Sequence, residues 1–295
     1  MVSRGVAGRA VRPELGVFKD RGSGLRQGEI MGNWRGDNMW RLFATGFVIG
    51  LSVLAAGTIS GARRQRRDKQ AENYRAEVAD ATPVEEGVMT PAQRVHGALY
   101  TSRNYPERMS TLIGGETIAE LARRSKENVL GIDALPGMGP LREQETPEHF
   151  FASLARESDA VVRGRAVKKT SQITVDGYFL FTDYELRVSE VFKDNPLAPI
   201  LAGSTITVTR PGGKIALHGV VIRVTDHYFY PLPMNGNEVV LFLKFVPVTG
   251  AYQPAGDSHS FEMLDSSVRA LNGDGVPTDL TSLQTILKAI RTTAN

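Results

Sequence analysis

Apolar and polar residues alternate with a period of two through much of the C-terminal half of the chain, from Ala160 onward. This period is typical of strands that bury one face. The longest predicted strand covers residues 178–192, and its alternation slips near Ser189–Glu190, which indicates a β-bulge. Asp176-Gly177 precedes this strand, and this dipeptide readily adopts the positive φ angles of a two-residue hairpin turn. We therefore expect a long hairpin around this turn.

Turn residues divide the same region into further predicted strands. Together with the first, they cover residues 161–167, 170–175, 178–192, 205–209, 215–225 and 238–248. The last strand is apolar at every position from Val239 to Leu243, so we expect it to be covered on both faces. A final helix begins at Thr281 and is expected to pack on the sheet through one apolar face. The residues of that face are Leu283, Ile286, Leu287 and Ile290.

Two short helices are predicted before the strands. Thr117 and Glu120 have the spacing of a capping box, in which each side chain bonds a free backbone N–H at the start of a helix. The second helix is expected to begin with Thr146 as its cap and Pro147 in its first turn. Its expected buried residues are Phe150, Phe151 and Leu154.

These elements predict a mainly β protein, with a small antiparallel OB-like barrel covered by a C-terminal helix. Several strands with irregular loops favour a closed or partly open barrel, because closure leaves few edges exposed. A helical linker region and an N-terminal membrane or signal helix are expected to precede the barrel. The predicted divisions are a disordered leader, a signal or membrane segment, a polar linker, two short helices and the barrel domain with its helix, at residues 1–41, 42–62, 63–110, 111–158 and 159–295.

Three runs carry a resemblance to a known group of proteins: FTDYELRVSEVFKDN, GSTITVTRPGG and NGNEVVLFLKF. They resemble a β-domain of uncharacterised exported bacterial proteins, which also begin with a hydrophobic leader. More distantly, they are similar to the OB-like barrel of netrin-like modules and tissue inhibitors of metalloproteinases. The resemblance covers roughly residues 155–250 and implies the fold. Those inhibitors rely on an N-terminal cysteine, which this chain lacks, so protease inhibition is not implied.

An apolar segment lies near the N-terminus. Leu42–Ala62 contains 21 residues without a charge, and a helix needs about 20 to cross a bilayer. It ends in Ser60-Gly61-Ala62, a pattern that signal peptidase cleaves. A signal peptide and a retained membrane helix are both open, and the basic residues of Arg63–Lys69 favour a cytoplasmic body if the helix is retained. We expect export, with translation starting at Met31 or Met39.

The basic character of the chain belongs to its leader. Eight of the 35 Lys and Arg residues and four of the 32 acidic residues precede Ala62, which leaves 27 basic and 28 acidic residues after it. A nucleic-acid-binding domain needs a concentrated basic face, so nucleic acid is disfavoured as a partner. The sequence contains no cysteine, which excludes disulfides, thiolate zinc sites, Fe–S clusters and a cysteine nucleophile.

No motif in the sequence specifies a reaction. No histidine lies two to four residues from another, so neither a metal nor another cofactor is expected; the histidines are His96, His149, His218, His227 and His259. Pro211–Lys214 lacks the full P-loop pattern, and Asn272–Gly275 lacks the acidic series of an EF-hand. Asp183, Glu185 and Arg187 alternate along one strand face, which we expect to be solvated.

The favoured hypothesis is a membrane-targeted or exported protein of the periplasm or cell envelope, whose barrel binds another macromolecule without catalysis. Its protein partner and oligomeric state are left open, and its catalytic residues are unassigned. One alternative is an exported hydrolase in which folding brings together His218, His227 and Asp183. Another is oligosaccharide or oligonucleotide binding on the barrel face, as OB-folds often provide.

Overall fold

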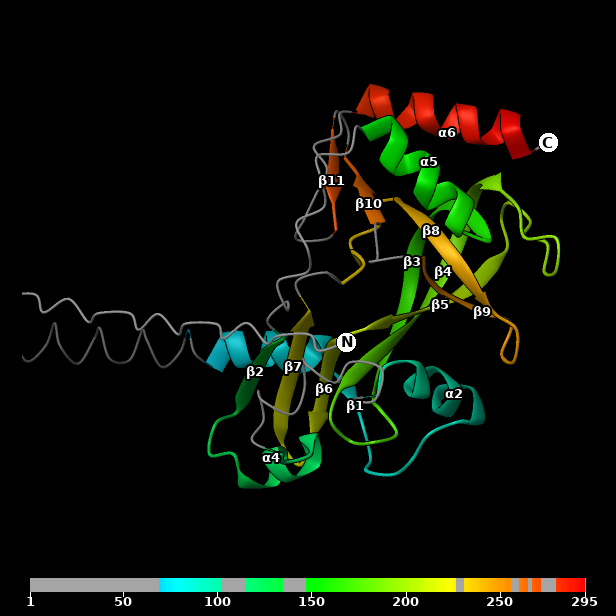
Figure 1. Ribbon diagram of the computed structural model, residues 1–295. Coiled ribbons are helices and arrows are strands. Elements are labelled where there is room, and N and C mark those ends of the chain that lie inside the picture. Colours follow the sequence, from blue (N-terminus) through cyan, green and yellow to red (C-terminus); the bar gives the residue numbers. More distant parts are fainter. Residues whose placement is uncertain are drawn as a thin grey trace, which may run out of the picture. The chain divides into compact units, whose positions relative to one another are not determined.

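The structure is a computed structural model of the chain (Figure 1). It describes residues 69, 71–101, 115–134, 147–226, 231–255, 260–264, 267–271 and 280–294. The predicted leader and the predicted membrane segment lie outside these residues. Among the helices of the described part, none is both long enough and apolar enough to cross a membrane.

Seven strands form the larger sheet, in the order β11-β10-β8-β3-β4-β5-β9 (Figure 1). Their bounds are β3 (Ala160–Ile173), β4 (Leu180–Lys193), β5 (Thr205–Pro211), β8 (Val239–Val246), β9 (Ala251–Pro254), β10 (Ser260–Met263) and β11 (Val268–Ala270). Neighbouring strands are antiparallel except β5 and β9, which run parallel where Val208 meets Tyr252. β8 also pairs with β9, so the pairing runs from β8 through β3, β4, β5 and β9 back to β8.

β3 and β4 form the predicted long hairpin. Gly177 in its turn has a φ of 80°, which glycine adopts without steric strain. The predicted bulge in β4 is confirmed, because the pairing with β3 steps from Glu190 to Val188 and leaves Ser189 as the extra residue. A second irregularity skips Val167 of β3. Such bulges increase the local twist and bend of both strands.

Four strands form the smaller sheet, in the order β1-β6-β7-β2. Their bounds are β1 (Thr82–Pro83), β2 (Val129–Ala134), β6 (Gly213–Leu217) and β7 (Val220–Asp226). The prediction of one strand over residues 215–225 is wrong. His218 and Gly219 have φ angles of 51° and 79°, and two successive positive φ angles reverse the chain into a hairpin. β1 and β2 join this hairpin in parallel, from segments where the sequence predicts linker and helix.

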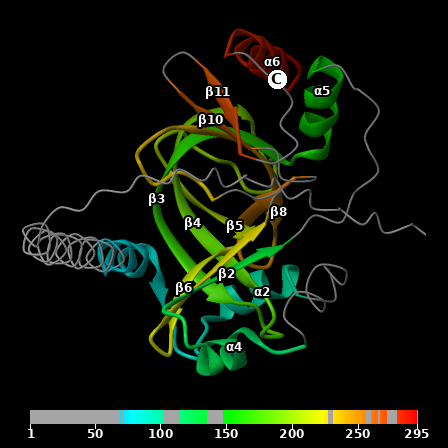
Figure 2. The same cartoon turned by 90° about the vertical axis from the view of Figure 1, so that its left-hand side faces the viewer.

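β8 is buried on both faces, as the sequence predicts. Val239, Leu241 and Leu243 face a hydrophobic cluster that also draws residues from β3, β4, β5 and β9. Val240 and Phe242 face a second cluster, formed with α5 (Pro147–Glu157) and α6 (Leu280–Ala294) (Figure 2). The helix α6 buries the predicted residues Leu283, Leu287 and Ile290 there.

The predicted capping box is also present. The Thr117 hydroxyl accepts the backbone N–H of Glu120, and the Glu120 carboxylate accepts the backbone N–H of Thr117, at the start of α4 (Ile118–Arg124). α4 and the smaller sheet share a third hydrophobic cluster with the turn end of the β3–β4 hairpin. The prediction of a mainly β protein with a C-terminal helix is therefore confirmed.

Candidate functional site

The candidate site is built around α2 (Pro91–Leu99), a short helix that contacts β3 and β4 (Figure 2). The Thr90 hydroxyl accepts the backbone N–H of Gln93, and the Gln93 side chain accepts the backbone N–H of Thr90 at 2.8 Å. This reciprocal capping box and Pro91 in the first turn satisfy or remove free N–H donors. The start of α2 is therefore fixed by its own sequence.

His96 and Tyr100 fasten α2 across two adjacent strands. They lie four residues apart, so both side chains project from one side of the helix and its C-cap. His96 Nδ1 lies 2.9 Å from Asp183 Oδ1, and the Tyr100 hydroxyl donates to the Thr209 carbonyl oxygen at 2.9 Å. Asp183 of β4 and Thr209 of β5 are direct cross-strand partners. The spacing on α2 therefore matches the spacing between the two strands.

Close packing accompanies these two hydrogen bonds. His96 and Tyr100 are 2% and 3% exposed, and the Tyr100 ring stacks on Phe181 of β4 with centroids 6.3 Å apart. Gly97 faces the same ring, because a Cβ built there would lie 3.1 Å from a carbon of Phe181. A larger residue at this position would push the helix away from the sheet, so glycine allows α2 to approach β4 closely.

A third element reaches the buried histidine. The Thr249 hydroxyl, in the turn between β8 and β9, lies 2.8 Å from His96 Nε2. The imidazole therefore bridges the Asp183 carboxylate of β4, through Nδ1, and the Thr249 hydroxyl of the β8–β9 turn, through Nε2. The order of carboxylate, imidazole and hydroxyl is the one that activates nucleophiles in many hydrolases.

Two observations favour anchoring over catalysis at this site. The backbone N–H groups of Thr249 and Gly250 donate to the Val246 carbonyl oxygen at 3.2 and 3.0 Å, so they do not point at a substrate oxyanion. His96 is only 2% exposed, and its ring is enclosed between α2, β4 and the β8–β9 turn. The side chains therefore hold the helix, both strands and the turn together.

The structure separates most of the residues that the sequence suggested for a hydrolase. Asp183 contacts His96 rather than His218, which lies exposed in the β6–β7 turn with Nε2 3.4 Å from Glu86. His227, like His259, lies outside the described residues. Across the described ranges, no three His, Asp or Glu side chains gather into a metal-binding group.

The polar strip on β4 is divided among different partners. Asp183 forms a hydrogen bond with His96, whereas Glu185 pairs with Lys168 at 2.7 Å on an exposed part of the sheet. Arg187 is exposed. The expectation of a solvated face therefore applies to the latter two residues and not to the first.

Sequence reasoning missed His96, Tyr100 and Thr249 as a group. Two signals were available for the helix: the capping-box spacing of Thr90 and Gln93, and the four-residue spacing of His96 and Tyr100. Neither signal identifies Asp183, because this partner lies 87 positions from His96 in the chain.

A charged cluster links the two sheets nearby. Asp80 accepts hydrogen bonds from Lys169 of β3 and from Lys214 of β6, the latter at 2.7 Å, and Glu77 lies 2.8 Å from the Lys214 amine. Burial alone would raise the pKa of Asp80, but the hydrogen bonds from the two lysines outweigh it and lower that pKa. The carboxylate is therefore held in its charged form as a connection between the sheets.

The chain matches no model of a known protein family and no curated protein sequence. The resemblance to exported β-domains and netrin-like modules therefore stays a prediction that rests on the strand patterns.

Proposed function

We propose that β3, β4, β5, β9 and β8 form an OB-like barrel, and that the chain is a non-enzymatic interaction protein of the cell envelope. The pairing of β8 with both β3 and β9 supports the barrel, because the five strands then form a ring of neighbours. This is the strand number of a Greek-key OB barrel. The chain's own sequence supports membrane targeting through Leu42–Ala62.

The occupied outer face of β4 and β5 carries the functional proposal. In OB barrels, the second and third strands and the loop between the fourth and fifth strands form the usual ligand surface. The corresponding elements here are β4, β5 and the turn that contains Thr249, and α2 contacts all three through His96 and Tyr100. The barrel therefore uses this face to bind part of its own chain, and partners are left to other surfaces.

The same face argues against the oligosaccharide and oligonucleotide alternative. Ligand binding of that kind depends on exposed aromatic rings and arginines along the strands. The outward residues here are Asp183, Glu185 and the exposed Arg187 on β4 and Thr207 and Thr209 on β5, while Phe181 is completely buried. A single arginine among carboxylates and threonines offers no stacking and little phosphate neutralisation.

An activity measurement on the purified full chain in detergent tests the absence of catalysis. We expect no turnover of ester, amide or glycoside substrates, and no difference between the native chain and the His96→Gln or Asp183→Asn variants. His218→Gln serves as a control, because that histidine is exposed and lies outside the anchor. Turnover that is lost in His96→Gln or Asp183→Asn but kept in His218→Gln would establish the exported hydrolase instead.

Fractionation of cells that express the chain with a C-terminal tag tests the envelope location. We expect the product in the membrane or exported fraction, and sequencing of its N-terminus distinguishes a cleaved signal peptide from a retained helix. Recovery of the whole product from soluble cytosol, with residues 42–62 intact, would overturn the proposal.

A further inference from the structure

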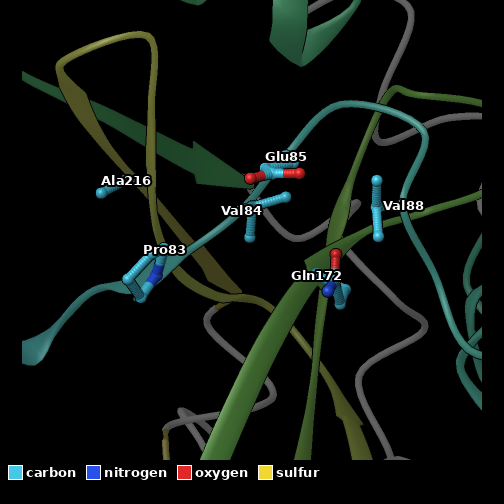
Figure 3. A pocket seen from close by; sticks show the side chains of 6 residues that line it. All are labelled: Pro83, Val84, Glu85, Val88, Gln172 and Ala216. Carbon is cyan, nitrogen blue, oxygen red and sulfur yellow. The ribbon is translucent and has the colours of Figure 1, made fainter.

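A small pocket lies beside β1, away from the buried histidine. It has a volume of about 340 Å³ and is lined by residues of β1, of the loop that follows it, of β3 and of β6 (Figure 3). These residues are Pro83, Val84, Glu85, Val88, Gln172 and Ala216. Four of the six are apolar, and the polar groups are one carboxylate and one amide. Pockets with mostly apolar walls and few polar groups are the usual form of a ligand site.

Two hydrogen bonds fix the walls of this pocket. The Val84 N–H donates to the Ala216 carbonyl oxygen at 3.1 Å and holds the loop against β6. The Ser171 N–H donates to the Thr82 hydroxyl at 2.9 Å and holds β1 against β3, next to Gln172. The opening between loop and strands is therefore built into the fold and does not depend on a ligand.

Glu85 is the acidic residue of this region whose charge is not matched by the protein. Glu77 and Asp80 contact Lys214, and Glu86 contacts Arg123 at 2.7 Å. Among the described residues, neither the Glu85 carboxylate nor the Gln172 side chain bonds another group of the protein. In Figure 3, the Glu85 carboxylate lies at the pocket together with Val84, between Ala216 on one side and Val88 on the other.

We propose that this pocket binds the side chain of a lysine or arginine presented by a partner protein. Lysine and arginine lay their methylene stems along apolar surface and keep the charged head in contact with acceptors. Val84, Val88 and Ala216 provide such a surface for the methylene stem. The Glu85 carboxylate and the side-chain amide oxygen of Gln172 provide acceptors for the charged group. The binding surface is separate from the α2 anchor.

The surrounding charges select this ligand over a zwitterionic amine such as an ethanolamine phospholipid headgroup. A headgroup carries a phosphate two carbons from its amine. That phosphate would lie near the unpaired Glu85 carboxylate of the pocket, where like charges repel. A lysine or arginine side chain has neutral methylene groups where the headgroup has its phosphate. These groups contact the apolar wall of the pocket, and no like charge faces the carboxylate.

Methyl NMR on the full chain in detergent tests the proposal with Nα-acetyl-lysine N-methylamide as the probe. We expect the probe to shift the methyl signals of Val84, Val88 and Ala216. The Glu85→Gln variant should bind about threefold more weakly or worse, as expected for one exposed ion pair. Glu86→Gln is the matched control, because its carboxylate is adjacent in sequence but already paired with Arg123.

Three comparison ligands make each outcome decisive. The Nε-acetylated probe and the norleucine analogue keep the stem without the charge, and both should shift these methyl signals less than the lysine probe does at the same concentration. Equal shifts from a neutral analogue, no shift from the lysine probe, or equal binding by Glu85→Gln would overturn the cation site. Tighter binding of phosphoethanolamine than of the lysine probe would assign the pocket to a lipid headgroup and equally overturn the proposal. The interaction function proposed above survives any of these results, because it depends on the occupied face of β4 and β5.

Discussion

The two sheets of this protein bury their apolar side chains in different ways. The larger sheet has hydrophobic clusters on both sides of β8, one shared with its own curved strands and one with α5 and α6. The smaller sheet has a single cluster, which it shares with α4 and the turn end of the β3–β4 hairpin. The larger sheet therefore provides most of the packing, and the smaller sheet is stabilised by attachment to it.

The chain connectivity differs between the sheets as well. Successive hairpins build most of the larger sheet, whereas the smaller sheet gathers β1 and β2 in parallel from distant segments. Gly213 lies at the transition between the two, where a Cβ would come within 2.3 Å of the Thr182 hydroxyl oxygen and 2.7 Å of the Ser171 hydroxyl oxygen. The sheets therefore meet at a point that admits no side chain.

The largest expected effect comes from the two-sided packing of the larger sheet. Phe242→Ala removes a ring that is 1% exposed and contacts Phe151 and Phe261 on the helix side of β8. We expect the free energy of unfolding to fall by about 3–5 kcal/mol, measured by denaturant titration of the full chain in detergent. Leu201→Ala is the control, because Leu201 is 72% exposed and should change the stability by less than about 0.5 kcal/mol. A loss of stability in Phe242→Ala as small as that in Leu201→Ala would contradict the conclusion that the larger sheet provides most of the packing.

A pair of glycine substitutions compares the two sheets directly. In β3, a Cβ on Gly164 would lie 2.5 Å from the Arg187 carbonyl oxygen, and this backbone atom cannot rotate away. We expect Gly164→Ala to lower the free energy of unfolding by about 1–3 kcal/mol. In β2, a Cβ on Gly131 would meet only the Arg223 side chain at 3.5 Å, so Gly131→Ala should stay within about 0.5 kcal/mol of the native chain. Thermal unfolding measures both variants. Equal losses of stability in Gly164→Ala and Gly131→Ala would show that β3 and β4 are packed less closely at Gly164 than described.

Local sequence signals account for what was predicted correctly. The Asp176-Gly177 turn, the bulge at Ser189 and the two-sided apolar run of β8 are each encoded within a few neighbouring residues. The parallel pairings of β1 with β6 and of β2 with β7 are not encoded locally. A strand of two or six residues has no distinctive period, and its partner lies far along the chain. The contact of His96 with Asp183 is likewise not encoded locally, because nothing in the sequence around either residue identifies its partner.

Two tyrosine variants compare the attachment of each sheet to the N-terminal part of the chain. Tyr100→Phe removes a buried hydroxyl that donates to Thr209 of the larger sheet, and we expect a loss of about 0.5–1.5 kcal/mol. Tyr74→Phe removes an exposed hydroxyl that donates to Gly219 of the smaller sheet at 3.1 Å, and we expect almost no loss, because water replaces that bond. Hydrogen exchange of the α2 amides should rise in the first variant alone. Equal losses would mean that α2 contributes little to the anchor.

The smallest effect concerns the carboxylate that connects the sheets. The folded state lowers the pKa of Asp80 below its usual value of 3.8, so the charged form favours folding. Its contribution is fully present above that value and is lost as the pH falls through the lowered folded-state pKa. We expect Asp80→Asn to cost less than about 1 kcal/mol at neutral pH, and the difference from the native chain to shrink on acidification. Glu72→Gln, in the same helical stretch, is the control and should change the stability by less than about 0.5 kcal/mol. A cost that persists in acid would contradict the ionic origin.

The fastening of α2 also sets an order of events during synthesis. His96 and Tyr100 leave the ribosome long before Asp183, Thr209 and Thr249 exist, so the helix waits without its contacts while more than half of the described chain is made. Contacts between such distant residues form late, because the intervening chain must first be closed into a loop. Until the residue at position 183 has emerged, chaperones therefore meet a helix with none of these three partners, and the set is complete only at position 249.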